Sequence, residues 1–387
     1  MTPAARVQAA IELLDDIATG TPAERALTGW ARRSRFAGSK DRAAVRDHVF
    51  QALRCWRSYA CLGGAATGRG LMLGALRDQG LDPTEVFIGQ GHAPKPLSED
   101  EDKAGAAPVS EVDRLDLPEW QVPLFRDALG PEADAAAMAL RQRAPVVLRV
   151  NMRLNTVPQA IEKLKECGVL AEPVAGVGTA LHVIDGARRV AQSQAYQSGL
   201  VELQDGSSQA AMNALDLPSG AKVLDYCAGG GGKVLALAAR IEGHWFAHDA
   251  DPARMADLAP RATRAGVRVV QVLGDQVAAH GPYDLVLCDA PCSGSGTWRR
   301  APDAKWRLTP ERLAELCDIQ AGILDQAQAL VAPGGRLAYA TCSLFRAENE
   351  AQSDSFVARH DGWHETDRRR WPVSAVGDGF YLSVFAR

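Results

Sequence analysis

The sequence predicts an α/β protein whose C-terminal part is a doubly wound domain with a mostly parallel sheet. From residue 204 onward, short apolar runs alternate with helical patterns, which is typical of strands joined by helical crossovers. The pattern before that point differs, because a helical stretch precedes a short strand–helix–strand–strand sequence. The strands expected in the last domain lie at 222–225, 245–249, 268–271, 283–289 and 336–341.

The chain divides into three predicted domains at 1–110, 111–203 and 204–387. In the first, apolar residues recur at helical spacing, and the charged, Pro-containing stretch 92–110 is predicted to be a linker. The second is predicted to be a small α+β domain that contacts RNA, although its pattern occurs in many proteins. The elements expected before the last domain are helices near 7–17, 43–62, 71–79 and 157–167 and strands at 146–150, 169–173 and 180–184.

The composition is typical of a soluble globular protein, with 47% of the 387 residues apolar and 23% charged. No apolar run approaches the roughly 18 residues of a membrane span, and the N-terminus lacks the layout of a secretory signal. We therefore expect a cytoplasmic protein without membrane contact. Eight cysteines are scattered along the chain, which favours reduced thiols over a disulfide framework.

A basic cluster near the N-terminus is the part of the charge pattern that points to nucleic acid. The net charge of −4 gives no such indication, but few acidic residues interrupt the cluster. With Trp56 and Tyr59 beside it, the cluster is either a solvated helix surface or a phosphate-binding patch. Its members are Arg32, Arg33, Arg35, Lys40, Arg42, Arg46, Arg54 and Arg57.

A run of glycines joins the first strand of the last domain to a helix. Glycine lets the backbone turn tightly, and the following helix N-terminus presents free N–H groups to a ligand. The spacing fits neither a P-loop nor a dinucleotide fingerprint, because Cys227 and Val234 occupy positions that those motifs reserve for other residues. We therefore expect a nucleoside ligand without a pyrophosphate. The loop comprises Cys227, Ala228, Gly229, Gly230, Gly231, Gly232 and Lys233.

Two aspartates follow the next strands and could complete this nucleoside site. Asp249 ends the second strand, where a carboxylate can accept hydrogen bonds from both ribose hydroxyls. Asp275 follows the third strand, where it could accept from an adenine amino group. Either residue alone is more often a turn or helix cap, but three such features at successive strand ends favour ligand binding.

Two cysteines follow the last two of these strands. If the strands are adjacent, Cys292 and Cys342 lie at the same sheet edge as the glycine loop. A thiolate that adds to carbon 6 of cytosine makes carbon 5 nucleophilic, and a second thiol can assist the later elimination. Asp289, which ends the fourth strand, could hold the ring nitrogen or the exocyclic amine. The alternatives are small buried residues or a metal site with Cys288, but the second pair of zinc ligands is missing, so no metal is expected.

Several ordered motifs in the last domain match one known family. They lie at 204–205, 208–209, 227–233, 289–293, 299–300, 302–303, 305–306, 339–343, 348–349 and 378–381. Through these motifs the chain resembles the Nol/Nop/Sun family of RNA (cytosine-5) methyltransferases. The resemblance implies a Rossmann-like class I methyltransferase domain with a seven-stranded sheet and S-adenosylmethionine as cofactor. It also implies Cys342 as the nucleophile, Cys292 as the group that assists release, and cofactor contacts from 227–233, Asp249, Asp275 and Asp289.

The N-terminal part carries a second resemblance. Through the stretch 36–42 and the helix after it, residues 1–90 resemble the NusB-like RNA-binding domain of the Sun branch, which acts on small-subunit ribosomal RNA. This likeness favours small-subunit ribosomal RNA over transfer RNA as the partner. A monomeric protein is expected. The glycine loop departs from the family, which usually has Ala-Pro at 229–230 and Thr in place of Val234, and the missing Pro is expected to loosen the loop.

Other functions stay open at this point. A DNA cytosine-5 methyltransferase would use a Pro-Cys thiol, here Cys292, and the Thr-Cys-Ser at 341–343 argues against it. A non-catalytic RNA-binding ribosome assembly factor would explain the four consecutive glycines, but both thiols and all three aspartates are present. Among RNA substrates, transfer RNA is the alternative to ribosomal RNA.

Overall fold

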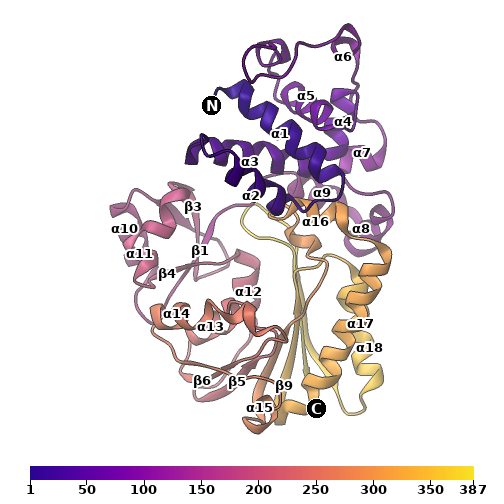
Figure 1. Cartoon of the computed structure of the whole chain (residues 1–387). Coiled ribbons are helices and arrows are strands. Elements are labelled where there is room, and N and C mark those ends of the chain that lie inside the picture. The colour runs from indigo at the N-terminus through magenta and orange to yellow at the C-terminus, as the bar shows by residue number, and fades with distance from the viewer. The chain divides into compact units, whose positions relative to one another are not determined.

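The computed structural model describes residues 1–387 and divides into two compact units (Figure 1). The first contains Met1–Arg143 together with Trp298–Leu308, and the second contains Ala144–Thr297 and Thr309–Arg387. A short segment of the C-terminal half therefore packs with the N-terminal helices. No helix combines the length and the apolar character needed to traverse a bilayer.

The first unit is helical, as expected for its N-terminal part. Its first helix begins after Thr2, whose hydroxyl accepts a hydrogen bond from the N–H of Ala5 (3.2 Å), and its apolar face lies in the core of the unit. The single helix expected over 43–62 is two helices, because Cys55 leaves the helical conformation (φ −116°, ψ 32°). The helices are α1 (Pro3–Ala18), α2 (Ala23–Arg33), α3 (Ser39–Arg54), α4 (Trp56–Gly63), α5 (Gly68–Asp78), η1 (Pro83–Glu85), α6 (Glu99–Lys103), α7 (Glu111–Leu115), α8 (Gln121–Leu129), η2 (Gly130–Glu132), α9 (Ala133–Leu140) and α16 (Pro302–Arg307).

The basic cluster is only partly available to a ligand. Arg54 is 7% exposed, and its Nε donates to the carbonyl oxygen of Arg299 (2.8 Å), so it cannot contact a phosphate. Tyr59 is buried, and Arg57 pairs with Asp113 (3.6 Å). Of the two alternatives left open for the cluster, Arg54 therefore fits neither a solvated surface nor a phosphate-binding patch, and the charge of Arg57 is already paired. The other cations of the cluster are exposed on α2, on α3 and in the turn between them.

The second unit opens with a four-stranded antiparallel sheet in the order β2-β3-β1-β4. Leu148 and Val150 of β1 pack against helices, whereas Arg149 points the other way, toward the glycine loop. The expected strand–helix–strand–strand pattern is confirmed, and β4 adds a strand that was not expected. The elements are β1 (Val147–Val150), α10 (Val157–Glu166), β2 (Leu170–Pro173), β3 (Ala180–Asp185), η3 (Ala187–Gln192), α11 (Gln194–Gln197) and β4 (Val201–Leu203).

The rest of the second unit is the predicted doubly wound domain. Its seven-stranded sheet has the order β10-β11-β9-β8-β5-β6-β7, and only the pairs that involve β11 are antiparallel. This confirms the predicted fold class. The elements are α12 (Gly206–Ala214), β5 (Ala221–Asp225), α13 (Gly232–Ala238), β6 (Gly243–Ala247), η4 (Pro252–Met255), α14 (Leu258–Arg264), β7 (Val269–Gln271), α15 (Gln276–Ala279), β8 (Tyr283–Asp289), η5 (Ser295–Thr297), α17 (Pro310–Ala327), η6 (Gln328–Leu330), β9 (Val331–Thr341), η7 (Arg346–Glu348), α18 (Glu350–Arg359), β10 (His364–Trp371) and β11 (Phe380–Ala386).

Both faces of this sheet are covered, and its strand order reverses at β5. One core joins the sheet to α12, α13 and α14, and the other joins it to α17 and α18, as the placement of these helices in Figure 1 also shows. The chain runs outward from β5 through β6 and β7, then returns to the other side of β5 with β8 and β9. Ligands of such sheets bind at the carboxyl ends of the strands beside this switch point.

Candidate active site

Two thiols meet at the carboxyl ends of neighbouring strands. β8 and β9 are parallel and adjacent, with Asp289 opposite Ala340. Cys342 follows β9 directly, and Cys292 lies in the loop after β8. Their sulfur atoms are 3.5 Å apart, and both side chains are partly exposed. The expectation that the two cysteines share one sheet edge is confirmed.

A buried carboxylate holds the two cysteine loops together. Glu348 is fully buried, and its Oε1 accepts from the N–H of Ser293 (2.7 Å) and from Gln320 (3.1 Å). Its Oε2 accepts from the hydroxyls of Ser293 and Ser343, each at 2.5 Å. Because these serines each follow one of the cysteines, this network fixes the distance between the thiols.

The two thiols differ in their electrostatic surroundings. The hydrogen bond from Cys292 lowers the pKa of the Cys342 thiol, against the opposing effects of burial and of Asp289, and the positive charge of Lys233 lowers it further. The same hydrogen bond raises the pKa of Cys292, as do burial and the charge of Glu348. Cys342 is therefore the sulfur that is better placed to be a thiolate, which is the nucleophilic form of cysteine.

An ion pair lies beside Cys342. Lys233 Nζ is 2.5 Å from Asp289 Oδ2 and 5.2 Å from the centre of the Phe380 ring. Burial disfavours the charge of Lys233, but the contact with Asp289 outweighs it and raises the pKa of Lys233. The glycine loop after β5 thus delivers a cation to the strand end that carries Asp289.

The glycine loop has little freedom to change its path. Gly231 has a φ of +79°, and a Cβ there would lie 2.1 Å from Leu258 Cδ1. The carbonyl oxygen of Gly230 accepts from Arg261 (2.5 Å), and that of Gly232 accepts from Arg149 (2.9 Å). Arg149 comes from the four-stranded sheet, so that sheet braces the loop that the missing Pro was expected to loosen.

Some backbone N–H groups of the loop are paired within the protein and others are not. The N–H of Gly229 donates to Asp249 (2.9 Å) and that of Val234 to Asp225 (3.2 Å). The N–H groups of Gly230, Gly232 and Lys233 donate to no group of the protein. Free donors at the start of a helix suit an anionic ligand group such as a carboxylate.

The structure places the two predicted aspartates differently. Asp249, 2% exposed, accepts from the N–H groups of Gly229 and Asp251 and pairs with Arg254 (3.2 Å). Arg254 also donates to the Oδ1 of Asp249 (3.4 Å), so a ligand hydroxyl would take the place of this partly exposed guanidinium. Asp275 is exposed beyond β7, at the start of α15, and caps no backbone group with its side chain. The glycine loop follows β5, Asp249 follows β6 and Asp275 follows β7. These three strands are consecutive in the sheet, so all three features lie along the same edge.

Two residues with unusual surroundings were not among the predicted site residues. Asp225 is buried at the end of β5, its Oδ1 has no partner, and burial together with Asp289 raises its pKa to about 7. The position of Asp225 at the end of an apolar strand is the sequence feature that could have identified it. Glu348 was singled out only as part of a matching motif. The predicted loop residue Cys227 has a raised pKa, chiefly because of burial, which makes it a poor nucleophile.

Comparisons with known proteins show the family to which the chain belongs. A family described as "16S rRNA methyltransferase RsmB/F" matches residues 212–385, and its ferredoxin-like domain matches residues 117–190. The ribosomal RNA small subunit methyltransferase B of Xylella fastidiosa strain 9a5c is 34% identical over 284 residues, which are 69% of this chain and 67% of that protein. The chain belongs to the RsmB/F family.

Other relatives agree with this membership. The enzyme of the same name from Serratia proteamaculans is 31% identical over 69% of this chain and 65% of its own length. The chain thus spans about two thirds of the relatives it matches. In fold, it is similar to a methyltransferase homolog protein from Pyrococcus horikoshii, with a TM-score of 0.62 and 23% identity over 72% of this chain and 99% of that one.

RsmB/F membership confirms the resemblance to the Nol/Nop/Sun family and the Rossmann-like methyltransferase fold. The four-stranded sheet that braces the glycine loop falls largely within the match to the ferredoxin-like domain. The NusB-like assignment of the N-terminal helices and the three domain boundaries stay predictions, as do the roles of the individual site residues.

Proposed function

We propose that this RsmB/F family member transfers a methyl group from S-adenosylmethionine to carbon 5 of a cytosine in RNA, most readily small-subunit ribosomal RNA. The observation that supports this best is the pair of thiols 3.5 Å apart, with the lower pKa on Cys342. We further propose that the protein acts as a monomer in the cytoplasm.

The residues around the glycine loop fit S-adenosylmethionine. The free N–H groups of Gly230, Gly232 and Lys233 suit the carboxylate of its methionine part. Asp249 is the acceptor for the ribose hydroxyls, which would replace its contact with Arg254. Asp275 is the candidate for the adenine amino group. When bound, the cofactor supplies an electrophilic methyl group.

Cys342 performs the covalent step. Its thiolate sulfur forms a bond to carbon 6 of the cytosine, and the electrons of the 5,6 double bond become available at carbon 5 to bond the methyl group. The proton on carbon 5 then leaves to a base or to water, the double bond re-forms, and the carbon–sulfur bond breaks. This returns Cys342 as a thiolate and leaves 5-methylcytosine.

Cys292 and Asp289 support this sequence of steps in different ways. The Cys292 thiol hydrogen-bonds to the sulfur of Cys342 and therefore stabilises it as the leaving group in the elimination. Asp289 keeps one carboxylate oxygen for the ion pair with Lys233. Its other oxygen can accept from the cytosine amine, or from the ring nitrogen once that nitrogen is protonated in the adduct. The base must be unstacked to reach these groups, so a loop or an unfolded RNA segment is the expected target.

Methyl transfer from tritiated S-adenosylmethionine tests the proposal. The purified chain is incubated separately with small-subunit ribosomal RNA, transfer RNA and duplex DNA, with Cys342→Ala as control. We expect label on ribosomal RNA as 5-methylcytosine and none with the variant. Label on transfer RNA alone would keep the chemistry and change the substrate. Label on DNA alone, or none on any nucleic acid, would refute the proposed function.

A further inference from the structure

A groove in the N-terminal unit has aromatic walls and no assigned role. It is about 660 Å³ in volume, which is within the range of sites for small organic groups. We call it the Phe36 groove. It is lined by residues of α1, by the end of α2 and the turn after it, and by the loop before α6. These residues are Met1, Thr2, Ala5, Gln8, Ala9, Glu12, Trp30, Arg33, Ser34, Phe36, Gln90, Gly91 and His92.

Phe36 is the unusual member of this groove. Its side chain is 75% exposed, whereas the other phenylalanines of the unit, Phe50, Phe87 and Phe125, are buried. A large apolar ring held in water makes no contribution to the core, and exposed aromatics are common where a protein binds a partner. Phe36 lies in the turn between Arg35 and the α3 helix, beside the basic residues of α2.

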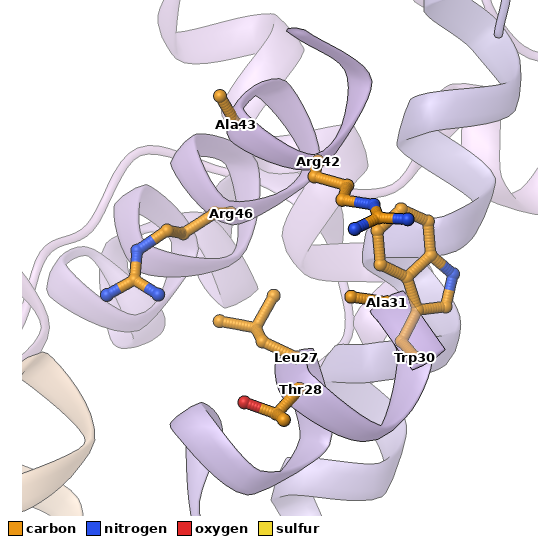
Figure 2. Close-up of a pocket in the computed structure, with 7 residues that line it drawn as sticks. All are labelled: Leu27, Thr28, Trp30, Ala31, Arg42, Ala43 and Arg46. Carbon is orange, nitrogen blue, oxygen red and sulfur yellow. The ribbon is translucent and has the colours of Figure 1, made fainter. Parts of the chain in front are cut away.

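A second hollow adjoins the groove through a shared residue. Trp30 lines both the Phe36 groove and a hollow of about 230 Å³ between α2 and α3. Figure 2 shows Leu27 and Trp30 of α2 on one side of this hollow and Arg42 and Arg46 of α3 on the other. Apolar walls and cations thus continue around α2.

The charge of this region is uncompensated. Residues 24–46 contain seven basic and two acidic side chains. Both acidic side chains are already paired, Glu24 with Arg46 and Asp41 with Arg6. Four exposed cations, Arg32, Arg33, Arg35 and Lys40, form no ion pair and no side-chain hydrogen bond. Arg33 lines the groove and Arg35 is next to Phe36 in the sequence, so an anionic partner of the groove would be attracted to this end of the unit.

We propose that the Phe36 groove binds a single-stranded RNA segment, with one base stacked on Phe36 and its phosphates on Arg33, Arg35 and Lys40. Stacking on an aromatic ring next to a basic track is how proteins hold unpaired nucleotides. Glu12, which accepts from Gln8 (2.9 Å), and His92 offer an acceptor and a further polar group to the base edge. The inference rests on the proposed RNA substrate and adds a contact outside the methyltransferase domain.

Binding of a labelled RNA by the full chain tests this inference without methyl transfer. The probe is a fluorescein-labelled 12-nucleotide single-stranded RNA of mixed sequence, followed by anisotropy at several salt concentrations. We expect Phe36→Ala to weaken binding roughly tenfold without changing the salt dependence, and Phe36→Trp to restore it. Arg33→Ala should lower the salt slope by about 1. The matched controls Leu81→Ala and Arg114→Ala, exposed in the same unit, should bind as the unchanged chain does.

An abasic version of the same RNA separates stacking from charge. The unchanged chain should lose affinity for the abasic RNA, and the Phe36→Ala variant should not distinguish the two probes. Equal RNA binding by Phe36→Ala and the unchanged chain, or no RNA binding at all, would overturn the inference; the former is the result expected if the groove takes a peptide. A chain that labels no RNA with methyl groups but shows the Phe36 effect would refute the proposed function and leave this site standing.

Discussion

At the scale of single residues, the two thiols are distinguished by their charged neighbours. Cys342 lies near both Asp289, which raises its pKa, and the cation of Lys233, which lowers it, whereas the carboxylate of Glu348 only raises the pKa of Cys292. The shared hydrogen bond lowers the pKa of Cys342 and raises that of Cys292. This asymmetry is why we assign attack to Cys342 and release to Cys292, although both thiols lie at the same sheet edge.

The release role predicts a stalled intermediate. In Cys292→Ala, Cys342 can still attack cytosine, but the departing sulfur has lost its hydrogen-bond donor. We expect a covalent protein–RNA species to accumulate when the variant is incubated with ribosomal RNA and S-adenosylmethionine, seen as a shifted band on a denaturing gel. Cys292→Ala/Cys342→Ala should show no such band. Normal turnover by the single variant, with no adduct, would count against the role of Cys292.

Asp225 predicts a pH-dependent stability difference. Its pKa is raised from 3.8 to about 7, because burial disfavours the charged form in the folded protein. The folded state is therefore favoured most below pH 4, where Asp225 is neutral, and loses this advantage as the pH rises toward 7. Asp225→Asn stays neutral throughout. The free energy of unfolding of Asp225→Asn should therefore rise relative to that of the unchanged chain between pH 4 and pH 8, by up to about 4 kcal/mol. Urea unfolding at both pH values measures this, and a pH-independent difference would contradict the burial argument.

At the scale of elements, loops that follow β8 and β9 are held by one side chain. Glu348 accepts four hydrogen bonds, from Ser293 twice, Ser343 and Gln320. In Glu348→Gln, one oxygen becomes an amide nitrogen that faces donors. We expect a loss of about 1–3 kcal/mol in unfolding free energy and a lower kcat with little change in KM.

The exposed Glu315 on α17 provides the matched control for this prediction. Glu315→Gln should change the unfolding free energy by less than about 0.5 kcal/mol and leave kcat unaltered. If Glu348→Gln behaved in the same way in denaturant titration and initial-rate assays, Glu348 would not be what sets the thiol geometry.

Some of the strands could be predicted from the sequence and others could not. Strands β5 to β9 and the cysteines at their ends were predicted, because apolar runs followed by Gly, Asp and Cys are local signals. β4 and β10 were not, since β4 has three residues and depends on pairing with β1, and β10 is an edge strand with an exposed polar sequence. The Glu348 network could not be derived, because Ser293 lies 55 positions away in sequence.

At the scale of the whole molecule, a piece of the methyltransferase motif set packs with the N-terminal helices. Within the first unit, Lys305 donates to the carbonyl oxygen of Arg54 (3.1 Å) and Trp306 to that of Leu53 (2.7 Å). Burial lowers the pKa of Lys305 to about 8. The chain thus leaves the second unit after Thr297, shortly beyond Cys292, and returns to it at Thr309.

This connection predicts a pattern of amide protection. Backbone amides within Trp298–Leu308 should exchange with deuterium as slowly as those of α3. The reason is that their hydrogen bonds break only when the first unit unfolds. Trp306→Ala should raise exchange in both segments together and leave β8 unchanged. Hydrogen-exchange mass spectrometry of the full chain measures this. Exchange of Trp298–Leu308 that followed α17 instead would show that the segment belongs energetically to the second unit.

The identity of the attacking sulfur is the most direct test of the whole account. RNA in which 5-fluorocytidine replaces cytidine cannot lose the substituent on carbon 5 as a proton, so the enzyme stays attached through its nucleophile. After incubation with S-adenosylmethionine, the trapped peptide is mapped by mass spectrometry. We predict that the RNA is bonded to Cys342. Attachment to Cys292 would reverse the roles proposed for the two thiols, and a methylated RNA without any covalent adduct would contradict covalent catalysis.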